Sequence, residues 1–237
     1  LKLGEVRNVV AEGEVRIEQS GQVATCEKVT FYPADERAVL TGRPRVTNGE
    51  AVVSGEVMQL KPSLAIVEGS VDERVVVTLP VMPDLGYEGF GASAPSSKNN
   101  ADETVTLIQS RTVRMIQEPT QTLFKFSEDV LITATNLEVS CGRLEVTARE
   151  MPVLPGSATT PVERLNLEKV EAFEKVLIKQ TGRVATADQA TILPNAGKVT
   201  LEGNAVVTDE RGRISGHRMT LLQSERRAIV EGGGPKG

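Results

Sequence analysis

Few residues of this chain have the type and spacing that catalysis or metal binding requires. Cys26 and Cys141 are its two cysteines, and His217 is its single histidine. A metal site needs several ligands close together, and an activated nucleophile needs a base with an oriented partner. The sequence also carries no phosphate-loop, zinc-protease or serine-hydrolase motif. We therefore predict a protein that is not an enzyme, with no metal site and no cofactor.

The acidic residues gather in three similar short segments, which are ADER at 34–37, VDER at 71–74 and TDER at 208–211. A calcium loop has a denser spacing of Asp, Asn and Gly than these segments show. We interpret them as solvated charges at turns, and we expect His217 to be a solvated surface residue.

Composition narrows the classes of partner. The 237 residues carry a net charge of −5, with Lys and Arg scattered among acids, so no basic stripe is available for nucleic acid. Aromatic residues are only 3% and Trp is absent, which disfavours stacking on sugars or bases. No apolar run approaches the roughly 18 residues of a membrane helix. Because the chain begins with Leu1, we expect that a signal peptide or anchor was removed upstream.

An internal repeat is the strongest signal in the sequence. Taking Gly13 as the anchor, the same pattern returns about every 29 residues, apart from two longer steps, from Gly69 to Glu128 and from Glu128 to Glu174. The anchors are Gly13, Gly42, Gly69, Glu128, Glu174, Gly203 and Gly232. Around each anchor apolar residues alternate, as in Val9, Ala11, Val15 and Ile17, which is typical of a strand with one apolar face. Turn-forming segments follow, so each copy is predicted to be a hairpin.

The second strand of each hairpin changes its alternation. Inward positions run through Ala24 and Cys26 and then continue at Val29 and Phe31. This parity flip predicts a bulge or bend in the second strand, with the small residue at the corner. Helical patterning is nearly absent, although a short helix near 162–169 is an open alternative to strand.

Two segments rich in Pro, Gly and Ser interrupt the repeat. We predict a first block at 1–81, a linker or long loop at 82–103, and a second block at 104–237 with an inserted loop at 151–167. Cys26 and Cys141 fill the same repeat position in different blocks, so we expect well separated, unpaired thiols.

The segment from Val9 to Leu60, with Glu12-Gly13, Glu68-Gly69, Glu202-Gly203 and Glu231-Gly232, resembles the OstA-like, or LptA-type, family of lipopolysaccharide-transport proteins. The resemblance covers about 9–79 and 122–233. It implies an all-β, elongated, open β-jellyroll whose apolar interior holds acyl chains. The simplest family member has one block, whereas this chain has two.

From the resemblance we expect non-enzymatic periplasmic transport of lipopolysaccharide or a similar lipid. Expected partners are that lipid, other envelope lipid-transport proteins of the same fold and further copies of this chain, end to end. The parity set supplies the residues expected to line the lipid groove: Val15, Ile17, Phe31, Val46, Leu60, Val130, Ile132, Val146, Val176, Ile178, Ile192, Val207 and Leu221.

Two other interpretations stay open at this point. A structural β-scaffold of the envelope with a filled core would show the same apolar pattern. A β-repeat polysaccharide enzyme is disfavoured by the missing carboxylate pairs and aromatics. If the blocks join, the strand near 71–79 should lie beside a strand at 105–116 or 122–133.

Overall fold

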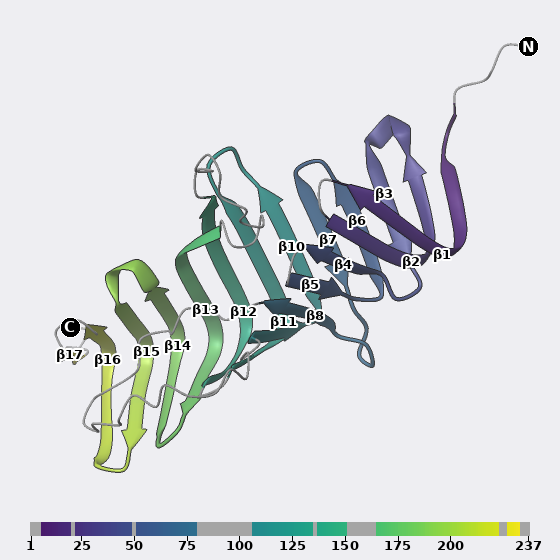
Figure 1. Cartoon of the computed structure of the whole chain (residues 1–237). Coiled ribbons are helices and arrows are strands. Elements are labelled where there is room, and N and C mark those ends of the chain that lie inside the picture. Colours follow the sequence, from purple (N-terminus) through teal and green to yellow (C-terminus); the bar gives the residue numbers. More distant parts are fainter. Residues whose placement is uncertain are drawn as a thin grey trace, which may run out of the picture.

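The structure, a computed structural model, describes residues 6–19, 22–48, 51–79, 106–134, 137–150, 165–222 and 227–232. These residues form one antiparallel sheet of 17 strands, and the only helical segments among them are two short 3-10 turns. None of their helices is long or apolar enough to cross a membrane. Figure 1 shows an elongated molecule with β1 at one end and β17 at the other, so the predicted all-β, elongated and open fold is confirmed.

The strands are β1 (Val9–Gln19), β2 (Gln22–Tyr32), β3 (Arg37–Thr41), β4 (Arg45–Asn48), β5 (Ala51–Ser54), β6 (Val57–Lys61), β7 (Leu64–Glu68), β8 (Val75–Leu79), β9 (Thr106–Ser110), β10 (Thr112–Gln117), β11 (Thr122–Ala134), β12 (Leu137–Glu150), β13 (Leu165–Gln180), β14 (Arg183–Leu193), β15 (Lys198–Asp209), β16 (Gly212–Leu222) and β17 (Arg227–Glu231). The 3-10 turns are η1 (Pro33–Asp35) and η2 (Pro194–Ala196). Residues 165–169 belong to β13, so the alternative of a helix there is wrong, while 162–164 lie outside the described residues.

The strands assemble as thirteen antiparallel rungs that follow one another in chain order. Nine rungs are single strands, and four consist of two short strands each, namely β3 with β4, β5 with β6, β7 with β8, and β9 with β10. Each rung except β17 turns a corner near its middle. One side of the corner, layer A, contains β3, β6, β7, β10 and β17; the other, layer B, contains β4, β5, β8 and β9. The remaining strands run through both layers.

The two predicted blocks share this sheet without a break. Val77 of β8 pairs with Ile108 of β9, and Val67 of β7 pairs with Val113 of β10, as expected for joined blocks. At the corner, the Gly69 N–H donates to the Arg111 carbonyl at 2.9 Å. The predicted linker at 82–103 and most of the inserted loop at 151–167 lie outside the described residues, so the block boundaries stay a prediction.

The corner is built differently from the sequence-based prediction. The parity flip is confirmed, since Cys141 and then Leu144 are buried in β12. The extra residue, however, lies in the first strand of the hairpin, because the register shifts between Ser127 and Val130 of β11 while β12 advances by one residue less. The same shift occurs in β1, β13 and β15. The predicted bend in the second strand is therefore confirmed, whereas the alternative of a bulge in that strand is wrong.

Four anchor residues of the repeat, Gly13, Glu128, Glu174 and Gly203, sit at this bulge and bend the strand through positive φ. Gly203 has φ +73°, and the anchors Glu128 and Glu174 have φ +65° and +70°. Glycine adopts this region without a penalty, whereas glutamate is strained there. Where the anchor is Glu174, the neighbouring strand has Gly142, and a Cβ at Gly142 would collide with the Glu174 side chain. At Glu174 the bend thus accepts Glu in place of Gly because the adjacent corner position is a glycine.

Candidate functional site

The interior of the folded sheet is the main candidate site, and layer A lines it with two continuous rows of side chains. The deep row, next to the corner, is Ala11, Val29, Leu40, Met58, Val67, Val113, Phe126, Leu144, Ala172, Ala190, Leu201, Met219 and Val230. The rim row is Val9, Phe31, Ala38, Leu60, Ala65, Met115, Phe124, Val146, Val170, Ile192, Val199, Leu221 and Ala228. Every side chain in both rows is apolar, so layer A presents an uninterrupted apolar surface along the molecule.

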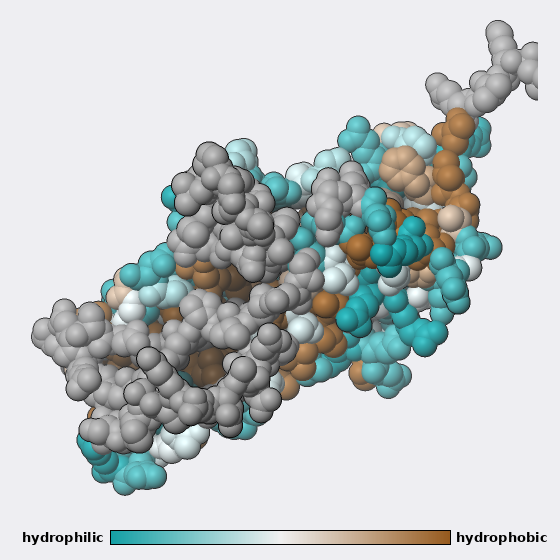
Figure 2. All heavy atoms as spheres, viewed as in Figure 1, coloured by the Kyte–Doolittle hydropathy of each residue, from teal (hydrophilic) through white to brown (hydrophobic). Residues whose placement is uncertain are grey.

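Layer B faces the same interior with a matching row, which is Ile17, Ala24, Val46, Val53, Val77, Ile108, Ile132, Val139, Ile178, Ala185, Val207 and Ile214. Residues of both layers belong to one hydrophobic cluster. Figure 2 shows apolar (brown) residues in several places along the long axis, with hydrophilic (teal) residues beside them.

All thirteen residues expected to line the groove lie on this interior. Six are buried: Val130, Ile132, Val146, Val176, Ile178 and Ile192. Six are partly buried against the same cluster: Val15, Ile17, Val46, Leu60, Val207 and Leu221. Phe31 is the exception, since it lies in the rim row but is 41% exposed. Their contact with lipid stays a prediction.

Sequence reasoning missed the interior residues of the rungs between 64 and 117. Val67, Val75, Val77, Ile108 and Val113 are all buried. The repeat loses its phase here because the rungs are split at the corner by loops of different length. The short alternations VVVTL and TLIQS were the signal that was available.

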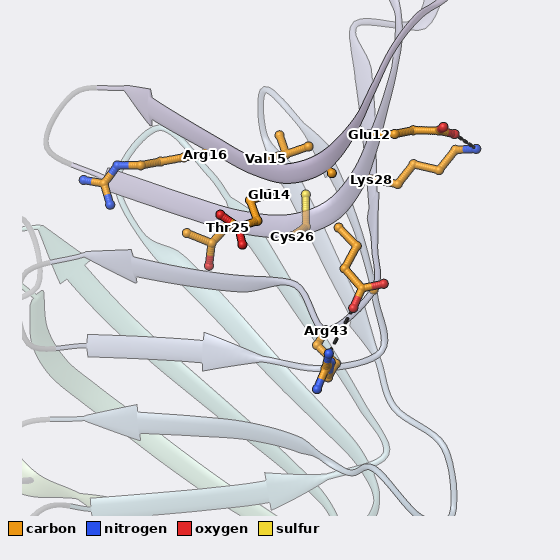
Figure 3. Close-up of a pocket in the computed structure, with 11 residues that line it drawn as sticks. Glu12, Glu14, Val15, Arg16, Thr25, Cys26, Lys28 and Arg43 are labelled. Atoms are coloured by element: carbon orange, nitrogen blue, oxygen red, sulfur yellow. Dashed lines mark hydrogen bonds and ion pairs between the residues drawn. The ribbon is translucent and has the colours of Figure 1, made fainter.

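A hollow of about 970 Å³ opens at the corner between β1 and β2 (Figure 3). Two ion pairs border it, Lys28 Nζ to Glu12 Oε1 at 2.7 Å and Arg43 Nη2 to Glu27 Oε1 at 3.0 Å. Its lining has three acids and three bases, because Glu14 and Arg16 add one of each. With no net charge and exposed partners, this hollow has no preference for an ion of either sign.

The cysteines are buried and poorly reactive. Cys26 in β2 and Cys141 in β12 are both free thiols. Burial raises the pKa of Cys26, and it raises the pKa of Cys141 to about 11. A thiol reacts as its thiolate, so neither sulfur is a ready nucleophile near neutral pH.

A second hollow, of about 340 Å³, lies in the interior at the C-terminal end. Its apolar lining is Val207, Ile214, Met219, Leu221, Ala228 and Val230. Its polar lip is Arg183, Asp209, Arg211, Gly212 and Arg213. At the lip, Asp209 faces Arg183, with 3.8 Å between Oδ2 and Nη2.

The interior can bind apolar groups but offers little for bond-making chemistry. Within the described ranges, no three His, Cys, Asp or Glu residues are placed to hold a metal ion. His217 and most of the acidic residues at turns are exposed, as for Asp35 in η1. A long apolar trough flanked by polar residues suits chains of methylene groups, each of which gains about 0.8 kcal/mol on burial.

Comparison with known proteins identifies the family. Residues 100–227, more than half of the chain, match the model of the LptA/(LptD N-terminal domain) LPS transport protein family. A search of curated proteins finds no match. The match spans β9 to β16, and β11 to β16 are the long bent rungs. This family acts in the cell envelope and its activity is transport, not catalysis. The chain therefore belongs to the LptA/LptD N-terminal domain family of lipopolysaccharide transport proteins.

Proposed function

We propose that this chain carries lipopolysaccharide through the periplasm by holding its acyl chains in the interior between layers A and B. Sugars and phosphates remain outside in water, because the interior rows contain no side chain that would pair with them. The thirteen residues expected to line the lipid groove from the sequence are then part of the contact surface. Energy for directional movement comes from partner proteins.

The continuity of the rows is the observation that supports this proposal best. The deep row and the rim row pass from β7 to β10 without a polar residue, although these two strands are not consecutive in the chain. Some side chains of the rim row are also accessible to solvent. Phe31 is exposed and Leu60, Met115 and Phe124 are half-buried, so acyl chains have apolar surface to meet between β2 and β11.

A structural scaffold without a lipid is the second candidate, and one observation favours it. Leu40, Leu144 and Leu201 in the deep row are 0% exposed, so this part of the interior is a packed core. A scaffold would need only that core. The accessible part of the rim row, between β2 and β11, is what distinguishes the two functions, since a filled scaffold has no reason to keep it apolar and accessible.

Co-purification separates the two candidates. The chain should be expressed in the periplasm of a Gram-negative host, purified without detergent and analysed for lipid by mass spectrometry. We expect lipopolysaccharide at a stoichiometry that falls in a Leu60→Ser, Met115→Ser double variant but not in the outward-facing control Gln59→Ser, Arg114→Ser. Purified protein free of lipid that also binds no added lipopolysaccharide would favour the scaffold.

The unpaired strand edges at the two ends of the sheet suggest the partners. Among the described residues β1 pairs only with β2, and β17 pairs only with β16, which leaves strand edges at both ends. Exposed edges recruit further strands. We expect envelope transport proteins of the same fold, or another copy of this chain, to add there. Size-exclusion chromatography across a concentration series and crosslinking of cysteines placed in β1 and β17 test this; a monomer at all concentrations would contradict self-association.

A further inference from the structure

The seam rung, formed by β9 and β10, lies between the rungs of the first predicted block and the unbroken strands. It pairs with β7 and β8 on one side and with β11 on the other. Its strand β10 runs beside β7 near the middle of the molecule (Figure 1). A lipid that moves along the whole interior has to pass this rung, so the apolar rows before and after it have to stay in line.

Apolar packing is thin at the seam rung in layer B. The inward residues of β8 are all apolar. Of the three inward residues of β9 only Ile108 is apolar, since Thr106 and Ser110 are buried beside it. The Ser110 hydroxyl donates to the Thr112 carbonyl of its own rung at 3.2 Å, so this bond does not join one rung to the next. Hydroxyl side chains also bury less apolar area than aliphatic ones, so contacts outside the core gain importance here.

Outside the core, a chain of hydrogen bonds crosses the corner of the seam rung. The Gly69 N–H donates to the Arg111 carbonyl at 2.9 Å, and the Arg111 N–H donates to the carbonyls of Ser127 and Glu128 at 3.2 Å and 3.1 Å. The Arg111 Nε also lies 3.5 Å from Glu128 Oε2. Each of these contacts joins one rung to the next.

Arg74 makes a longer contact, which reaches across the seam rung. It ends the 69–74 loop between β7 and β8, and its guanidinium donates a hydrogen bond to the Asp129 carbonyl in β11. Asp129 belongs to the positive-φ pair at the bulge of β11, with φ +53°. Arg74 thus ties together two rungs that are not neighbours, one from each predicted block.

Two observations distinguish this brace from an ordinary corner contact. The loop that carries Arg74 is closed on itself, because the Ser70 N–H donates to the Glu73 carbonyl at 2.8 Å and the Glu73 N–H donates to Ser70 Oγ at 3.1 Å. At the bulge of β15, by comparison, Asn204 Nδ2 donates to Asp188 Oδ2 of the adjacent β14 at 2.9 Å, so that contact spans one step of the sheet and not two.

We infer that Arg74 is a positioning residue for lipid transport: its bond to the Asp129 carbonyl sets the angle between the parts on either side of the seam rung and keeps their apolar rows in line. The inference rests on the proposed function and adds the residue that aligns the path. A guanidinium suits this role, since its planar fork makes charge-assisted hydrogen bonds of fixed geometry. Without the bond, the sheet hinges where its apolar packing is thin.

Distances between spin labels test the alignment directly, in a chain whose two native cysteines are replaced by serine. Thr25→Cys in β2 with Thr186→Cys in β14 spans the seam rung, whereas Thr133→Cys in β11 with Ser215→Cys in β16 lies on one side of it; all four positions are exposed. We expect Arg74→Gln to broaden or shift the distance of the first pair and to leave the second pair unchanged.

Three further variants identify the atoms that act. Arg74→Lys keeps a cationic donor, so it should retain more of the narrow distribution than Arg74→Gln does. Asp129→Asn removes the side-chain charge but keeps the carbonyl, and Asn tolerates positive φ, so it should behave like the parent. Arg43→Gln removes a guanidinium from the corner between β3 and β4, where Arg43 pairs with Glu27 of the adjacent β2 at 3.0 Å, and it should also behave like the parent.

Passage of lipid gives a readout that a loss of stability alone would not move. With benzoyl-phenylalanine at Leu60, before the seam rung, or at Ile192, after it, the parent should form adducts with lipopolysaccharide at both positions. Arg74→Gln should change the ratio of the two adducts by about fivefold, the effect of one net hydrogen bond on a two-state equilibrium. A general loss of stability lowers both adducts together and leaves their ratio unchanged.

Five results would each overturn the inference. They are an unchanged distance across the seam rung in Arg74→Gln, an equal change in the pair on one side of it, the same change in Arg43→Gln or Asp129→Asn, no recovery in Arg74→Lys, and an unchanged adduct ratio. Failure of the proposed function is seen separately. If the parent forms no adduct at either position while Arg74→Gln still changes only the distance across the seam rung, Arg74 still holds the two parts in line and the transport proposal falls.

Discussion

The rungs in the two halves of this molecule turn the same corner by different means. From β3 to β10 each rung is broken at the corner, as at Gly42 to Pro44 and in the loop 69–74. From β11 to β16 each rung runs through without a break, and the first strand of each hairpin bends at a positive-φ pair such as Glu128–Asp129. The family model matches 100–227, which is mostly the unbroken half.

The difference shows that the inward alternation, and not the corner, is the part of the repeat that forms the interior. Both halves keep the apolar rows in register, so Leu40 and Leu144 occupy the same deep row with the same 0% exposure. The corner can vary because other backbone hydrogen bonds close it, such as those from the Glu56 N–H to the Glu68 carbonyl and from the Gly69 N–H to the Arg111 carbonyl, both at 2.9 Å. Inward alternation is under a tighter constraint, since a one-residue slip would turn every apolar side chain outward.

The largest expected effect is the loss of folding when a charge is placed in the deep row. Leu40→Asp in the broken half and Leu144→Asp in the unbroken half should each lower the free energy of unfolding by about 3–5 kcal/mol, because an unpaired carboxylate is buried. The outward neighbours Thr41→Asp and Arg143→Asp should cost less than about 1 kcal/mol. Urea denaturation gives the values. A normal midpoint for Leu40→Asp alone would show that the halves do not share a core.

The corner glycines give an intermediate effect that differs between the halves. Gly203→Ala should cost about 1–2 kcal/mol, because the Cβ is strained at φ +73° and collides with Asp188. Adding Asp188→Ala should recover the part due to the collision. Gly13→Ala has positive φ but nothing within 4 Å of its Cβ, so it measures the strain alone.

Gly42 is the matching residue of the broken half, with φ +76° and Glu27 in place of Asp188. We expect Gly42→Ala to cost less than Gly203→Ala, since the break between β3 and β4 lets the backbone shift. Thermal denaturation of the four variants decides the order. Equal costs at Gly42 and Gly203 would mean that the break gives no freedom.

Thiol reactivity should also differ between the halves. The pKa of Cys141 is raised to about 11 by burial, so its thiol stays protonated up to that pH in the native state and labels slowly. Cys26 lies beside the hollow at the β1 corner and should label faster. Rates with a maleimide at pH 8, in single Cys→Ser variants, measure this. The unfolded, unreduced parent should show two thiols, and zero would contradict the repeat alignment.

The unfolded chain ionises these thiols at a lower pH than the native protein does. The stability that Cys141 contributes by staying neutral is therefore present at neutral pH and lost as the pH rises from the unfolded pKa toward about 11. Cys141→Ser should flatten this alkaline loss more than Cys26→Ser does. The same alkaline profile in both variants would argue against the difference in burial.

The smallest effect comes from surface ion pairs at equivalent corner positions. Lys28 donates to Glu12 at 2.7 Å, and Arg218 faces Glu202 at 3.1 Å in the other half. The hydrogen bond and charge of Lys28 lower the pKa of Glu12, and Glu12 raises the pKa of Lys28. The contribution of Glu12 to stability is present above its unfolded pKa and lost as the pH falls through its folded pKa.

Side-chain NMR titration checks this pair. Lys28→Met should raise the pKa of Glu12 toward its ordinary value, and half-molar salt should do so partly, because both side chains are exposed. The global stability should hardly change in Lys28→Met. An unchanged pKa of Glu12 would show that the pair does not form in solution.

The sequence predicts the inward alternation well and the corners poorly, for a physical reason. Alternation is set by burial, so apolar residues such as Ile132 and Ile178 indicate which face of the strand is buried. The bulge depends on positive φ angles, which a glutamate such as Glu128 or Glu174 does not indicate in the sequence. Only the Gly residues at other anchors are typical of positive φ. The polar lip of the C-terminal hollow was missed because Arg183 pairs with Asp209 across β14 and β15, through a register that no local pattern reveals.

The central claim is that one interior crosses both halves and holds acyl chains. It is tested most directly by photo-crosslinking lipopolysaccharide to benzoyl-phenylalanine at inward Leu60 and Ile192, with outward Gln59 and Thr191 as controls. The account predicts adducts at both inward positions and none at the outward ones. Adducts in one half only, or equally on both faces, would contradict a continuous interior path.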